Sequence, residues 1–175
     1  MFKDMQLSKD MQVEYSKQLK NNQVSDIQLS VEVLTNGNWP MEEYPTCVIP
    51  KELKSCVDRF ERYYHNKHQN RKLQWMYQFG QIELQPTYIT ERNYQLVVNV
   101  FQTAVLSLFN EVTKLTYKEI ADKTTIPKKR LDAALIALCK PGVQVLIKEI
   151  KKPSFESDTE TVTLNMKFSN PAVRL

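Results

Sequence analysis

Two histidines are the residues that first suggest chemistry. His65 and His68 are three positions apart in the stretch YYHNKHQNRKLQWMY, residues 63–77, and this spacing can put two imidazoles on one face of a helix. A metal ion would need two more ligands, and the nearby acids Asp58 and Glu61 lie further up the same predicted helix. The pattern is more typical of solvated or capping histidines at a helix C-terminus, where positive charge is favourable. We therefore predict no metal site here.

The other reactive side chains do not form a catalytic pattern. Cys47, Cys56 and Cys139 are odd in number and make no Cys-x-x-Cys pair, so they indicate neither a disulfide framework nor a zinc site. No Gly-x-Ser-x-Gly motif is present, the carboxylates are scattered, and three glycines leave no material for a phosphate-binding loop. We expect a non-enzymatic, intracellular and reduced protein without a cofactor.

Three consecutive cations are the strongest binding signal in the residues themselves. Lys128, Lys129 and Arg130 lie at the predicted start of a helix, where the recognition helices of DNA-binding modules often approach the groove. Their charge opposes the helix dipole, so an external anion would favour them. The formal charge of +4 is mild, however, and acids interleave with bases nearly everywhere. From the residues alone, DNA binding, a protein-interaction module and a solvated turn all stay open.

Composition is that of an ordinary globular protein. A chain of 175 residues is long enough to bury a core, and hydrophobic and charged residues make up 42% and 25% of it. The apolar runs are far shorter than the roughly 20 residues of a membrane span, and the start MFKDMQLSKD has no apolar secretion-signal region. We predict one domain or two small ones, without a membrane segment.

Hydrophobic periodicity predicts a helix near the start of the chain. Met11, Tyr15 and Leu19 form one apolar stripe on a helix over residues 8–21, and Ser8 is its predicted N-cap. One stripe on a short helix cannot bury itself. We therefore interpret this helix as the end of a larger helical element.

The period then alternates between strand and helix up to residue 99. Alternation predicts a strand over residues 27–35, IQLSVEVLT, with one buried face. A helix follows Pro50, with an apolar face of Leu53, Cys56, Val57, Phe60, Tyr63 and Tyr64. Residues 72–79 alternate again, and a tight turn at Gly80-Gln81 would return the strand IELQ as a hairpin. YQLVVNV is a further strand, so residues 23–99 predict an α+β layer.

Two capping boxes predict the helices that follow. Asn99 with Gln102 and Thr116 with Glu119 have the spacing in which two side chains cap one helix start, and Pro127 opens a third helix. The apolar residues of these helices are Val105, Leu108, Phe109, Val112, Ile120, Ala121, Leu131, Leu135 and Leu138. VLIKEI and TVTLNMKF then alternate as two strands joined by the loop KKPSFESDTE. The predicted fold class is α+β: a small mixed sheet with packed helices, followed by a winged-helix module.

Several stretches resemble the C-terminal part of the cullins, the elongated scaffolds of RING ubiquitin ligases. The opening MFKDMQLSKDM and the segment VEVLTNGNWP are similar to family motifs. FERYYHNKHQNRKLQWMYQFGQIEL is similar to the family pattern of spaced aromatics, RKL and tryptophan. YQLVVNVFQTAVLSLFN, LTYKEIADKTTIPKKRLDAALIALC and LNMKF continue the resemblance in the family's order over nearly the whole chain.

The resemblance implies a non-catalytic scaffold that supports ubiquitin-dependent protein degradation in the cytoplasm and nucleus. Its partner would be a RING-box protein, which carries the zinc, adds a strand to the cullin sheet and recruits the ubiquitin-conjugating enzyme. The contact residues expected for that strand are Leu29, Val31, Leu73, Trp75, Leu96 and Val98. Lys128 and Lys129 become candidates for contact with acidic segments of the conjugating enzyme. The alternative is a winged-helix DNA-binding protein that uses Lys128, Lys129 and Arg130.

The resemblance also predicts the domain organisation. The predicted parts are the end of a helical bundle (1–22), an α/β domain (23–99), a winged helix (100–170) and a tail (171–175). Cullins begin with a long helical arm and end in a second winged helix that carries the lysine modified by a ubiquitin-like protein. KFSNPAVRL ends near the hinge to that module, so the modified lysine has no counterpart. We therefore expect this chain to be a fragment.

Overall fold

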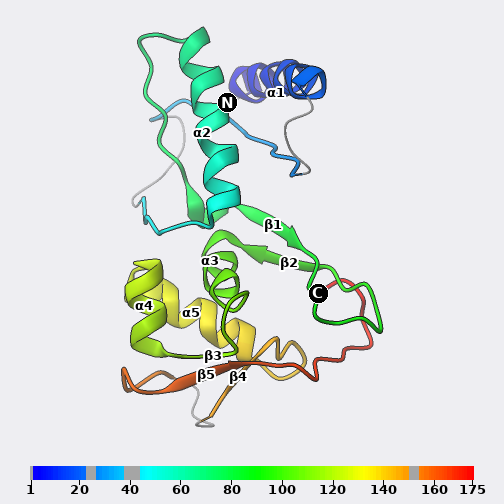
Figure 1. The fold of residues 1–175 in the computed structure, drawn as a ribbon. Helices are drawn as coiled ribbons and strands as arrows, with labels where there is room; N and C mark the ends of the chain where they lie inside the picture. The colour runs from blue at the N-terminus through cyan, green and yellow to red at the C-terminus, as the bar shows by residue number, and fades with distance from the viewer. Residues whose placement is uncertain (1, 23–26, 38–43, 150–153) are drawn as a thin grey trace. The chain divides into compact units, whose positions relative to one another are not determined.

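The computed structural model describes most of the chain, drawn as a ribbon in Figure 1, over residues 2–22, 27–37, 44–149 and 154–175. The chain forms two compact units: unit 1 is Met1–Glu43 with Lys51–Gln74, and unit 2 is Tyr44–Pro50 with Trp75–Leu175. The α/β domain predicted over residues 23–99 is shared between these units, and the predicted domain limits stay predictions. Within the described ranges, no helix is long and apolar enough to cross a membrane.

Unit 1 is built on two helices, α1 (Phe2–Asn22) and α2 (Lys51–Lys67). α2 confirms the helix predicted after Pro50, and its buried side chains belong to the predicted face: Cys56, Val57, Phe60, Tyr63 and Tyr64. The ring of Tyr15 from α1 packs against Phe60 and Tyr63, at 5.1 and 5.0 Å between ring centroids. The apolar stripe predicted on the first helix therefore meets α2 through edge-on and tilted aromatic contacts.

The predicted start of α1 at Ser8 is wrong. The helix begins at Phe2, because MFKDMQL contains no glycine or proline that would stop it. Ser8 lies inside the helix with 4% of its surface exposed. Its hydroxyl accepts a hydrogen bond from the backbone N–H of Val33 and caps no helix.

Two of the predicted strands do not form β-ladders. In the described residues, the strand predicted over 27–35 pairs with no other strand, and side chains of α1 hydrogen-bond to part of its backbone. Residues 72–79 include the 3-10 helix η1 (Tyr77–Phe79), in which the N–H groups of Phe79 and Gly80 bond to carbonyls three residues back. The hairpin predicted at Gly80-Gln81 is therefore wrong.

The strand that follows Gly80 pairs with a later part of the chain. β1 (Gln81–Leu84) is antiparallel to β2 (Leu96–Asn99), with Ile82 opposite Val98. β2 confirms the strand predicted in YQLVVNV, and Tyr94, Leu96 and Val98 are buried as the alternation predicts. Gly80, which follows the 3-10 turn, lies directly against the start of the next helix: a Cβ at Gly80 would be 2.5 Å from Val100 Cγ2.

Three helices follow β2, as predicted: α3 (Val100–Leu108), α4 (Tyr117–Thr124) and α5 (Lys128–Cys139). Both capping boxes are present, at Asn99 with Gln102 and at Thr116 with Glu119. Their buried apolar side chains form one core, whose helical members include Val105, Ile120, Leu131, Leu135 and Leu138. Val112 was assigned to the first of these helices, but it lies beyond the end of α3 and is 38% exposed.

A three-stranded antiparallel sheet closes this core. Its strands are β3 (Lys114–Thr116), β4 (Leu146–Lys148) and β5 (Thr161–Leu164), in the order β3-β5-β4. The predicted terminal hairpin is present. β3 was not predicted, because a strand of three residues is too short to show a hydrophobic alternation in the sequence. Ile150 and residues 151–153, predicted as strand end and loop, lie outside the described residues. The α+β class is confirmed, and the element order is compatible with the winged-helix interpretation, which stays a prediction.

A buried ion pair holds the hairpin loop to β4. Lys148 Nζ lies 2.8 Å from Glu160 Oε2 and 4.0 Å from the centroid of the Phe155 ring, and both charged side chains are almost fully buried. Glu160 also accepts hydrogen bonds from the backbone N–H groups of Glu156 and Ser157. The hydrogen bond from Lys148, helped by these two donors, lowers the pKa of Glu160 to about 2.

The close approach of Gly80 to Val100 generates a first prediction. Gly80→Ala should lower the free energy of unfolding by about 1–3 kcal/mol, because the added methyl would overlap the Val100 side chain and force a local shift. Val100→Ala removes the overlapping methyl, so the double variant should lose less than the sum of the single losses in urea denaturation. Strictly additive losses would show that the two residues are not in contact.

The ion pair of Glu160 predicts acid sensitivity. Since its folded pKa lies below the ordinary value near 4.5, its contribution is complete above about pH 5 and is lost as the pH falls toward 2. Glu160→Gln should cost roughly 3 kcal/mol at pH 7 and flatten this acid loss in urea denaturation from pH 7 to 2.5. The exposed Glu111→Gln should leave the pH profile unchanged. A Glu160→Gln profile parallel to that of the wild type would contradict the assignment.

Candidate functional site

The candidate site is an extended segment of unit 1, residues 27–33, which we call the edge segment. Over residues 28–33 its side chains alternate in exposure as a strand's do: Leu29, Val31 and Val33 are partly buried, and Gln28, Ser30 and Glu32 are exposed. The segment nevertheless belongs to no β-ladder. Its local pattern is that of a strand, so its hydrogen-bonding groups need partners of another kind.

Two polar side chains of α1 supply these partners along one edge. The Gln12 amide donates to the carbonyl of Leu29 at 2.9 Å and accepts from the N–H of Val31 at 3.0 Å. The Ser8 hydroxyl accepts from the N–H of Val33 at 2.8 Å and donates to the carbonyl of Val31 at 3.4 Å. Two side chains thus satisfy four backbone groups of alternate residues.

The match between helix and segment is geometric. Residues four apart on a helix are separated by about 6 Å along its axis, and residues two apart on a strand by about 6.6 Å. The distance between Ser8 and Gln12 along the axis of α1 therefore nearly equals the distance between Val33 and Val31 along the segment, which runs in the opposite direction. Ser16 continues this row one turn later, and its hydroxyl lies 3.4 Å from the Gln12 amide nitrogen.

The opposite edge of the segment is open. In an extended chain, the N–H and C=O groups of successive residues point to opposite sides, so those of Gln28, Ser30 and Glu32 point away from Ser8 and Gln12. In the part of the chain that the structure describes, these three residues make no hydrogen bond. An open row of donors and acceptors is the feature to which another strand adds.

The chemistry that this site offers is backbone hydrogen bonding. The row offers alternating N–H donors and C=O acceptors, flanked by one partly buried apolar face and one exposed polar face. Within the described ranges, no group of three or more histidine, cysteine or acidic side chains could hold a metal ion. The arrangement therefore suits an extended peptide strand of alternating character.

Comparison with known proteins decides the family. The model of the cullin alpha+beta domain matches residues 33–168. This chain belongs to the cullin family. It is 37% identical to Cullin-3 of Dictyostelium discoideum over 91% of its length, and 34% identical to Cullin-4A of Mus musculus over its full length. Cullin-2 of Arabidopsis thaliana is 32% identical, again over all of this chain.

The chain spans only part of these cullins. It covers 20% of Dictyostelium Cullin-3, 24% of Arabidopsis Cullin-2 and 23% of mouse Cullin-4A. The resemblance to cullins inferred from the sequence motifs is therefore confirmed at the level of the family. The family assignment alone does not assign the binding partners and activity of a whole cullin to this chain.

The six residues predicted to contact a RING-box protein are divided between the two units. Leu29, Val31 and Leu73 are partly buried in unit 1, and Trp75 is partly buried in unit 2. Leu96 and Val98 lie in β2 of unit 2, at 4% and 8% exposure. Their role as contacts stays a prediction.

β2 is hydrogen-bonded along both edges. β1 lies on one side, and the N–H groups of Val97 and Gln95 donate to the carbonyls of Leu175 and Val173 on the other, at 2.7 and 2.8 Å. Residues 173–175 thus run parallel to β2, and Arg174 pairs with Glu83 of β1. The edge segment differs from β2 because its second side is unoccupied in the described chain.

The basic cluster at the start of α5 is partly engaged within the chain. Lys128 lies 3.6 Å from Asp132 and 5.0 Å from the centroid of the Tyr117 ring. The Tyr117 hydroxyl donates to Asp132 at 2.7 Å, and burial together with this bond raises the tyrosine pKa. Lys128 therefore has an internal counterion. Contact with DNA or with an acidic partner stays a prediction for this cluster.

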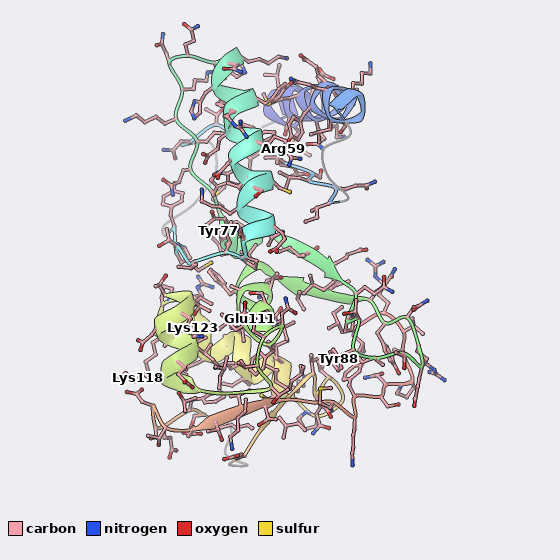
Figure 2. The ribbon with its side chains drawn as sticks, viewed as in Figure 1. Arg59, Tyr77, Tyr88, Glu111, Lys118 and Lys123 are labelled. Carbon is pink, nitrogen blue, oxygen red and sulfur yellow. The ribbon has the colours of Figure 1, made fainter. Side chains whose placement is uncertain are left out.

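Further cations on α4 do not extend this cluster into a purely basic surface. Lys118 and Lys123, labelled in Figure 2, are exposed on α4. Glu119 and Asp122 are exposed on the same short helix. Acidic and basic side chains are therefore mixed on the exposed surface of α4, as they are in the sequence.

Sequence reasoning missed the two residues that organise the site. Ser8 was interpreted as a helix cap and Gln12 was given no role, yet both lie beside the edge segment. The available signal was the spacing of Ser8, Gln12 and Ser16 at four-residue intervals, next to the apolar stripe of Met11, Tyr15 and Leu19. The rings of His65 and His68 lie 5.9 and 4.8 Å from that of Tyr64.

Proposed function

We propose that this chain is a non-catalytic part of a cullin-RING ubiquitin ligase scaffold that docks a RING-box protein. The RING-box protein adds a strand to the open edge of residues 27–33 and brings its zinc and the ubiquitin-conjugating enzyme to the complex. The complex supports ubiquitin-dependent protein degradation in the cytoplasm and nucleus.

The observation that supports this proposal most is a strand pattern without a strand partner. Residues 28–33 alternate in exposure as a half-buried strand does, yet they join no ladder in the described chain. One edge is satisfied by Gln12 and Ser8, and the other is open. A strand from another molecule that completes the second edge would resolve this discrepancy, and membership of the cullin family supports a RING-box protein as that molecule.

Backbone pairing of this kind supplies affinity, and the flanking side chains supply selectivity. Each backbone hydrogen bond formed at an open edge contributes about 0.5–1.5 kcal/mol net, so three or four of them make a substantial part of an interface. The apolar face of Leu29, Val31 and Val33 would gain further burial when a second strand lies beside it. An exposed edge is also prone to self-association, which a bound partner prevents.

The open edge predicts the effect of a single proline. Ser30→Pro removes an N–H that the incoming strand needs, while an extended backbone tolerates proline and its preceding residue. We expect affinity for a co-expressed RING-box protein to fall at least tenfold, measured as Kd or as yield in co-purification. Ser30→Ala is the matched control because it keeps the N–H, and it should bind as the wild type does.

Two outcomes would count against this proposal. A wild-type chain that retains no RING-box protein on co-expression would remove docking from its function. Equal binding by Ser30→Pro and Ser30→Ala would place the contact elsewhere than the open edge.

A further inference from the structure

We infer that Gln12 and Ser8 are positioning residues for partner binding: they act as a substitute strand that holds the edge segment extended and determines which of its edges is open. This inference rests on the proposed function, because it explains how the same site is prepared for its partner. It adds two residues of α1 that would not touch the partner's strand.

The hydrogen-bonding groups of Gln12 support this role. A residue in a β-ladder offers a neighbouring strand one donor and one acceptor, and a primary amide side chain offers the same pair. Gln12 uses both, since it donates to Leu29 and accepts from Val31. Ser8 repeats the arrangement one helical turn earlier by accepting from Val33 and donating to Val31.

Burial makes the arrangement specific. Ser8 is 4% exposed and Gln12 is partly buried, so water competes poorly for these hydrogen bonds. The bonds fix the backbone of alternate residues and leave Gln28, Ser30 and Glu32 directed outward. A shift of the segment by one residue would exchange the two edges and move Leu29 and Val31 to the exposed face, so the α1 contacts also set the register.

Preorganisation is the physical benefit. A free chain of seven residues loses backbone entropy when a partner strand fixes it, and that loss reduces affinity. Because α1 already holds the segment extended, part of this backbone entropy is lost when the chain folds and is not lost again when the partner binds. Removing the α1 contacts should therefore weaken binding even though the removed side chains lie on the opposite edge from the partner.

The test compares two glutamines of the same helix. Gln12→Ala should weaken binding of a RING-box protein to the 175-residue chain about tenfold, measured by calorimetry. Gln18→Ala is the matched control, because Gln18 is exposed on α1 and makes no hydrogen bond in the described chain; it should bind as the wild type does. Wild-type affinity in Gln12→Ala would overturn the inference while leaving the proposed docking intact.

A second measurement needs no partner. In the chain alone, hydrogen–deuterium exchange of the Val31 amide should accelerate at least tenfold in Gln12→Ala, with that of Val57 in α2 unchanged. Equal acceleration at Val57 would mean that the substitution loosens the whole unit, and a slow Val31 amide would mean that Gln12 does not hold it. Either result would overturn the positioning role. If the wild type binds no RING-box protein but Val31 responds as expected, the proposed function fails and the positioning of the segment stands.

Discussion

The hydrogen bonds from α1 to the edge segment are the interaction on which the proposed docking depends. A strand needs partners along both of its edges, and Gln12 and Ser8 provide them along one only. Because these side chains come from a helix, they satisfy the backbone groups on that side of the segment without adding a further strand, which would have an exposed edge of its own. The remaining row, at Gln28, Ser30 and Glu32, is then the single direction in which the described segment can be extended.

Unit 2 illustrates the contrasting solution within the same chain. There, β2 is enclosed by β1 and by residues 173–175, and the three-stranded sheet of β3, β5 and β4 packs against three helices. The buried pair of Lys148 and Glu160 fixes the loop of that sheet from inside. This unit is a closed core, whereas unit 1 carries a segment whose hydrogen bonding is half complete.

Sequence reasoning recovered the elements that local signals determine. The two capping boxes, the helix after Pro50 and the strand in YQLVVNV each depend on neighbouring residues, and all are present. The predictions from sequence failed where a contact with a residue far along the chain determines the local structure. Gly80 lies against Val100, twenty residues away, where a hairpin turn was predicted, and Ser8 bonds to Val33, twenty-five residues away. Alternation identified the edge segment as strand-like but could not show which edge α1 would occupy.

The most direct test of docking at the open edge is amide exchange with and without a partner. Val31 and Val33 should exchange slowly in the free chain and in a complex with a RING-box protein, because α1 holds both amides. Ser30 and Glu32 should exchange fast in the free chain and become protected in the complex. A stable complex in which Ser30 and Glu32 still exchange at the free-chain rate would contradict strand addition at this edge.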